Sequence, residues 1–154
     1  MKKILLPFIA LALLAACNSG GEEKKVSEEQ QLVDSLWNKI DDAHMVGMKK
    51  MPKLSAVQNS IQKSLDSISK LPAKAKQAAA GAKEKLDTLL KQVEYANFAM
   101  DKWMKEFKFD IEKEYPDIKQ RIEYLKSEEI KVEKMKEAIE SSLGKADTVL
   151  KKIF

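Results

Sequence analysis

The chain of 154 residues has few of the residue types that form turn-rich folds and most catalytic sites. It contains one cysteine, one histidine, five glycines and four prolines. A lone cysteine cannot form a disulfide within the chain, and so few glycines and prolines leave little punctuation for many strands. One histidine excludes the paired Glu-x-x-His pattern of di-iron bundles and the His-Glu-x-x-His zinc motif. Because a glycine-rich phosphate loop and a triad spacing are also missing, we predict that the protein is not an enzyme.

The single cysteine, Cys17, ends an N-terminal segment made of two lysines, an apolar run and the residues Leu-Ala-Ala. This segment resembles a bacterial lipoprotein signal peptide with its lipobox. The resemblance implies removal of residues 1–16 and acylation of Cys17 by palmitate or a similar chain, which anchors the protein in the cell envelope. At about a dozen residues, the apolar run is too short to span a bilayer as a stable helix. Asn18 is not the aspartate that often signals inner-membrane retention, so we expect the outer membrane, with the protein facing the periplasm or the cell surface.

Charge gives no second reason for membrane or nucleic-acid binding. Removal of residues 1–16 takes away two lysines and lowers the formal net charge from +4 to +2. With 34% charged residues in near balance, the chain has no dominant basic face for phosphates. We therefore expect no nucleic-acid partner, and we expect membrane attachment through the lipid alone.

The rest of the chain predicts an all-α fold. Residues 17–26 are polar and contain glycine, so we expect a flexible tether after the lipidated cysteine. Ser27 and Gln30 fit a capping box at the start of a helical domain over 27–154. The apolar periodicity predicts three helices, over about 27–70, 73–113 and 116–153. Short connections between them predict an antiparallel up-down-up three-helix bundle resembling a coiled coil, with a possible kink or break near Gly47 to Pro52.

Apolar residues recur in each predicted helix at alternating spacings of four and three, the heptad pattern of a buried seam. The predicted seam includes Val33, Trp37, Ile40, His44, Gly47, Met51 and Gln58 in the first helix, Leu90, Asn97, Met100 and Met104 in the second, and Ile122, Glu129, Lys136 and Leu143 in the third. Glu129 falls near the level of position 101 in the second helix, where it could be a buried carboxylate. A position on a solvent-exposed face of the third helix is the simpler interpretation. We expect Lys136 to extend its ammonium to solvent.

Histidine and methionine gather in two segments of the predicted helices. His44, Met48 and Met51 share one stripe of the first helix, and Met100, Trp103 and Met104 share one face of the second. If the first turn centres near residue 73, antiparallel packing places these two stripes at one height. The sequence therefore predicts a site between the first two helices with one imidazole and up to four thioethers.

Thioethers are neutral, soft donors that bind hard cations poorly, so this set favours Cu(I) or Ag(I) as the bound ion. The predicted metal ligands are His44, Met48, Met51, Met100 and Met104. We expect Trp103 to cover the ion by a cation–π contact, and Asp41 to accept the free ring N–H of the histidine. The predicted function is capture of the ion for buffering, resistance or delivery.

Two other interpretations fit the same residues. Methionine is a flexible core residue, so the chain can instead be a structural or partner-binding coiled-coil lipoprotein, with an envelope protein as partner and no metal. A haem held by histidine and methionine is a minor alternative, because three helices leave little room for a porphyrin.

Segments 44–51 (His-Met-Val-Gly-Met-Lys-Lys-Met) and 99–107 (Ala-Met-Asp-Lys-Trp-Met-Lys-Glu-Phe) resemble paired segments in a group of small bacterial lipoproteins often labelled "viral A-type inclusion protein". That label reflects coiled-coil similarity and implies no viral role. The resemblance extends over most of the mature chain. Separately, the histidine, methionine and tryptophan set is similar in ligand chemistry to that of periplasmic Cu(I) and Ag(I) chaperones, which are small β-barrels.

Overall fold

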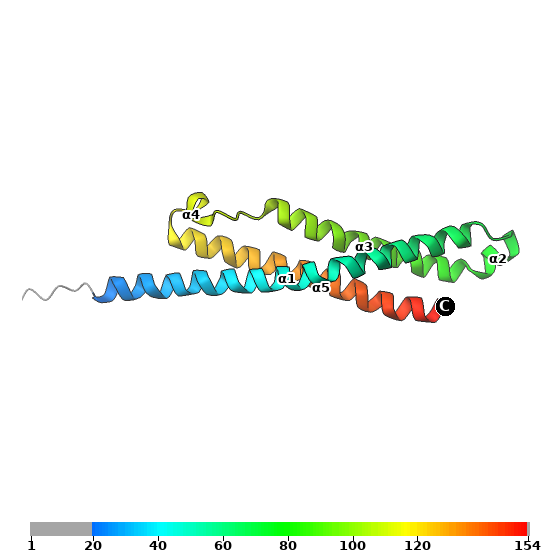
Figure 1. Cartoon of the computed structure of the whole chain (residues 1–154), viewed down its shortest axis with the longest axis horizontal. Helices are drawn as coiled ribbons and strands as arrows, with labels where there is room; N and C mark the ends of the chain where they lie inside the picture. Colours follow the sequence, from blue (N-terminus) through cyan, green and yellow to red (C-terminus); the bar gives the residue numbers. More distant parts are fainter. Residues whose placement is uncertain (1–19, 154) are drawn as a thin grey trace, which may run out of the picture.

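The computed structural model describes residues 20–153, and the surroundings of side chains over 28–152. This part of the chain is all-α and contains no strand, as predicted. Its five helices are α1 (Gly20–Ser69), α2 (Ala73–Ala78), α3 (Ala80–Glu106), α4 (Ile111–Glu114) and α5 (Ile118–Ile153) (Figure 1). The predicted signal peptide and Cys17 lie outside the described residues.

α1 begins earlier and runs further without interruption than the sequence predicted. It starts at Gly20, so the expected cap at Ser27 is wrong, and the described part of the predicted tether is helical. Pro52 lies inside the helix and does not break it. Its side chain is exposed, so the carbonyl of Met48 that loses its hydrogen bond is on the solvent side of the helix. In Figure 1 the blue-to-cyan part of α1 and its green-tinted end point in different directions, so the helix bends instead of breaking.

The second predicted helix, 73–113, is divided into three pieces. A turn at Ala79 separates α2 from α3. Phe107 leaves the helical conformation, with φ −64° and ψ 132°, and is buried in the core. Asp110 then caps α4 by accepting a hydrogen bond from the backbone N–H of Lys113 at 3.4 Å. The chain thus turns at the aromatic core residue, several positions before the proline that was expected to end the helix.

α1, α3 and α5 pack against one another along a rod (Figure 1). α1 and α5 run in the same direction, because Lys39 pairs with Glu129 at 3.0 Å and Lys53 pairs with Asp147 at 3.2 Å. Lys50 forms a third pair of this kind, with Glu140. α3 runs the opposite way and is linked to α1 by a hydrogen bond of 2.7 Å from Asn97 to Gln58.

In each long helix, one of the two predicted heptad rows is buried as expected, and the other row is displaced over much of its length. The row containing Val33, Ile40 and Gly47 and its counterparts in α3 and α5 are buried as expected. The alternate row is one residue earlier in α1, in α3 and in the middle of α5, whereas Ile122 and Leu143 of α5 are buried as predicted. The residues that replace the predicted ones in the core are Leu36, Ala43 and Val57 in α1, Leu89, Ala96 and Trp103 in α3, and Glu128 and Met135 in α5; Ser142 is buried beside Leu143. Both spacings have the same mean period, so only the packing of each helix against two neighbours selects between them. At two positions the closely packed interior takes a small side chain, Ala43 or Ala96, in place of the larger predicted residue.

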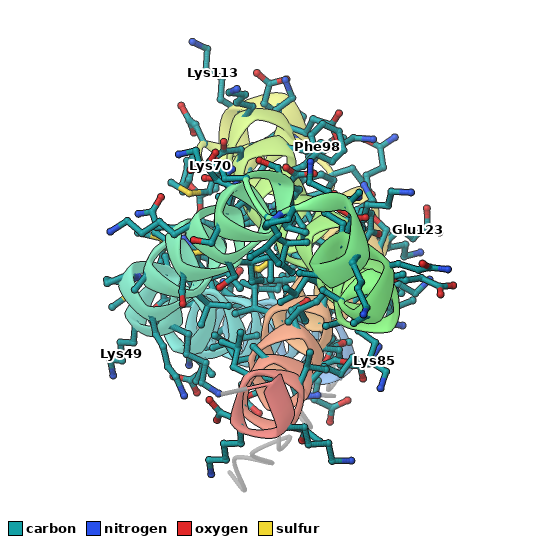
Figure 2. All side chains as sticks on the ribbon, turned by 90° about the vertical axis from the view of Figure 1, so that its right-hand side faces the viewer. Lys49, Lys70, Lys85, Phe98, Lys113 and Glu123 are labelled. Carbon is teal, nitrogen blue, oxygen red and sulfur yellow. The ribbon has the colours of Figure 1, made fainter. Side chains whose placement is uncertain are left out.

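Charged side chains surround this core. Figure 2, a view along the rod, shows Lys49, Lys85, Lys113 and Glu123 pointing away from the helices. Among the helices of residues 20–153, none is both long enough and apolar enough to cross a membrane.

Candidate metal site

His44 lies at the centre of the site, on the inner flank of α1. Its ring is half-buried and stacks at a tilt of 41° on the ring of Trp103 from α3, with 5.2 Å between ring centroids. Its Nε2 atom is buried and has no hydrogen-bond partner among the described residues. An unpaired buried polar atom costs about 1–3 kcal/mol, so this nitrogen is a site at which a ligand would stabilise the protein.

Trp103 is held in place by a carboxylate from α5. Its side chain is 6% exposed, and its Nε1–H donates a hydrogen bond of 3.0 Å to Oε2 of Glu128. Glu128 is itself 3% exposed, and its other oxygen accepts from the ammonium of Lys131 at 2.6 Å. A buried indole N–H normally needs such a partner. The ring that covers His44 is therefore fixed by all three long helices.

Gly47, one turn after His44 on the same face of α1, lets two methionines approach the backbone. A Cβ atom at this position would lie 2.7 Å from Cε of Met100 and 3.3 Å from Sδ of Met135. Both methionines are almost fully buried, at 1% and 3% exposure. The missing side chain of Gly47 is what allows the thioether of α3 and that of α5 to meet against α1.

The structure brings only part of the predicted ligand set into the interior. Met100 is buried, and His44 and Met51 are half-buried. Met48 and Met104 are each 38% exposed, on the outer flanks of their helices. This difference follows from the shifted heptad row, which turns both side chains towards solvent.

The expected partner of the histidine is also not in place. Asp41 is exposed, and no hydrogen bond joins it to His44 within the described part of the chain. On α5 the carboxylate at this level is Glu128, whereas Glu129 is half-buried and pairs with Lys39.

Met135 is the residue that sequence reasoning missed. The predicted stripe of α5 passed through Lys136, its neighbour, because a spacing of four was chosen there instead of three. A spacing of seven from the buried Glu128 to Met135 would have found it. The interior set is therefore one imidazole and two thioethers, contributed by α1, α3 and α5.

Aromatic rings continue the core from Trp103 towards α4. Phe107 lies 4.8 Å from Trp103 and 5.6 Å from Trp37 between ring centroids. Tyr124 lies 6.0 Å from Phe107, and its hydroxyl accepts a hydrogen bond of 2.6 Å from the backbone N–H of Lys108. Burial raises the pKa of Tyr124 to about 12. These rings extend the aromatic part of the core from Trp103 towards α4.

No known family model matches this chain, and comparisons with curated proteins and with solved structures give no significant match. Over the described residues there is also no group of three or more histidine, cysteine, aspartate or glutamate side chains arranged to hold a metal. The donors that the described residues offer to a metal at this site are the imidazole and the thioethers.

Proposed function

We propose that the protein is a lipid-anchored envelope protein whose antiparallel three-helix bundle binds Cu(I) or Ag(I). The ligands are His44, Met100 and Met135, one from each long helix. The observations that support the proposal are the buried, unpartnered Nε2 of His44 and the two buried methionine side chains that lie against Gly47, one turn further along α1. Met135 replaces the outward-facing Met104 in the ligand set, Met48 belongs to the outer flank, and Met51 packs half-buried against the core.

Charge and donor type select the ion. An imidazole nitrogen and two thioethers are neutral, so they compensate poorly for the desolvation of a divalent cation and suit a soft monovalent one. The indole of Trp103 already lies against the imidazole, and a cation held there would gain a cation–π contact worth about 0.5–2 kcal/mol. Burial in the core would also exclude water from the ion.

The exposed methionines give the site a route to solvent. Met48 follows His44 by one turn, and Met104 follows Met100 by one turn, and each is 38% exposed. Two surface thioethers at the rim of a buried thioether site can pass a soft ion inwards without a charged intermediate ligand. The protein would then buffer, detoxify or deliver the ion at the envelope.

The test is competition for Cu(I) with a colorimetric chelator under reducing conditions, with tryptophan emission recorded in parallel. We expect one ion per chain and quenching of Trp103. Met100→Leu and Met135→Leu conserve volume, so the fold tolerates them, and each should weaken binding at least about tenfold, as for loss of roughly 1.4 kcal/mol. Met45→Leu is the matched control, because Met45 is adjacent in sequence and 43% exposed.

Equal affinity in the wild type and in the Met100→Leu, Met135→Leu double variant would exclude this ligand set. Loss of binding in Met45→Leu together with unchanged binding in that double variant would show that copper binds surface methionines and not the interior.

The second candidate is a structural or partner-binding coiled-coil lipoprotein without metal. The tight contact of Gly47 with Met100 favours it, because a methionine filling the space over a glycine is ordinary core packing. A ligand that binds only the folded state must raise the melting temperature. An unchanged melting temperature at saturating Cu(I) would therefore favour this second function over the first.

A further inference from the structure

A separate groove lies between α3 and α5, on the side of the molecule where Phe98 reaches the surface. Its volume is about 370 Å³, and its apolar walls come from Tyr95, Phe98, Trp103 and Met135. Ligand pockets in proteins are typically about 300–1,000 Å³, so the groove suits a small molecule better than a protein partner. The groove does not depend on a metal ion, although it shares two core residues with the metal site.

Two aromatic side chains that line the groove are mostly exposed to solvent. Tyr95 is 62% exposed and Phe98 is 60% exposed, one turn apart on α3. Phe98 is labelled in Figure 2, at the outside of the helices. The floor consists of Trp103, at 6% exposure, and Met135, at 3%. An apolar chain in this groove would gain about 25 cal/mol for each Å² that it removes from water.

The rim of the groove carries one positive charge more than its partners neutralise. Lys102 is 3.9 Å from Glu106, and Lys131 is 2.6 Å from Glu128. Lys134, the third lysine of the lining, has no carboxylate within 4.0 Å in the described part of the chain. A single anionic head group would therefore complete the charge balance beside the apolar walls.

We infer that this groove binds a monoanionic amphiphile, namely a carboxylate attached to a hydrocarbon chain. The carboxylate lies at Lys134, and the hydrocarbon lies on Phe98, Trp103 and Met135. A neutral chain of the same length would leave the lysine unpaired, and a cationic chain would be repelled by it. The groove thus selects for the sign of the head group as well as for the apolar tail.

The experiment uses the full chain carrying Cys17→Ser, without metal, so that no attached acyl chain competes. Dodecanoate, dodecanol and dodecylamine are each titrated below micelle formation, in a Trp37→Phe background in which Trp103 is the remaining tryptophan. We expect saturable binding of one dodecanoate per chain with a change in tryptophan emission. Dodecanol should bind roughly tenfold more weakly, as for the loss of one charge-assisted contact, and dodecylamine more weakly still.

Matched variants locate the site. Lys134→Gln should weaken dodecanoate binding roughly tenfold and remove the preference over dodecanol. Phe98→Ser should weaken all three ligands roughly tenfold. Lys119→Gln and Phe109→Ser are the controls, since Lys119 is exposed and Phe109 is 64% exposed away from the groove.

Three results would overturn the inference: no binding of dodecanoate, equal binding of dodecanoate and dodecanol, or equal effects of Phe98→Ser and Phe109→Ser. The last two would identify non-specific adsorption to exposed apolar side chains.

Discussion

Adding a methyl group at Gly47 tests the close approach of the three long helices at the proposed site. In Gly47→Ala the new Cβ would lie 2.7 Å from Cε of Met100 and 3.3 Å from both Sδ of Met135 and Cδ1 of Ile139. The terminal methyl of Met100 can rotate away, but the two other atoms come from α5 and limit the space into which it can move. Such overpacking typically costs about 1–3 kcal/mol.

Helix propensity acts in the opposite direction, because alanine is favoured over glycine inside a helix by about 1 kcal/mol. Gly144→Ala isolates this gain. Gly144 lies within α5, is exposed, and would have no atom within 4 Å of its new Cβ. We expect Gly144→Ala to raise the free energy of unfolding by up to about 1 kcal/mol. The free energy of unfolding of Gly47→Ala should be about 1–3 kcal/mol lower than that of Gly144→Ala.

The assay is chemical denaturation of both variants followed by far-UV circular dichroism. The unfolding free energies are compared with one common value for their dependence on denaturant concentration. A Met100→Leu background removes the atom at 2.7 Å, so there Gly47→Ala should regain part of its loss. If Gly47→Ala stabilises the protein as much as Gly144→Ala, the helices do not approach as closely as described, and the site is wrong.

Four further variants have expected outcomes, three from the environments of the substituted side chains and one from the N-terminal sequence. His44→Phe keeps the ring against Trp103 and removes the unpartnered nitrogen, so the metal-free protein should lose no thermal stability while Cu(I) affinity falls. Glu128→Ala leaves the indole N–H of Trp103 without an acceptor and should lower the unfolding free energy by about 1–3 kcal/mol in denaturation. The pKa of Tyr124 is about 12 in the folded protein and 10.0 without the fold, so its contribution to stability should be complete below pH 10.0 and disappear as the pH rises towards 12. In a spectrophotometric titration of the tyrosines, the phenolate that forms near pH 12 should be missing from Tyr124→Phe. Cys17→Ser should abolish incorporation of labelled palmitate and release the protein from the membrane fraction, whereas persistence in that fraction would refute the lipid anchor.

The helical periodicity made the all-α fold and the meeting of two segments predictable. The stripes containing His44 and Trp103 were expected at one height, and the two rings lie 5.2 Å apart between centroids. This agreement arises because a helix rises by a constant distance per residue, so a turn position fixes which residues share a height. The interruptions at Ala79 and Phe107 were not predicted, since neither is a strong helix breaker by itself.

Side-chain orientation around each helix was harder to predict than height along it. Spacings of three-then-four and four-then-three give the same periodicity, and each α1 row offers apolar residues, such as Leu36 beside Trp37. The structure buries Ala43 and Ser142 because small side chains fit where helices approach closely. Met135 was missed and Met104 was misplaced by this one ambiguity.

The central claim is that a soft metal ion is held between the helices by His44, Met100 and Met135. X-ray absorption spectroscopy of the protein loaded with one equivalent of Cu(I) measures the ligand types directly. We predict a shell of one nitrogen and two sulfur atoms, which should lose one sulfur in Met135→Leu and stay unchanged in Met45→Leu. A shell without sulfur, or one that loses its sulfur in Met45→Leu and keeps it in Met135→Leu, would contradict the site.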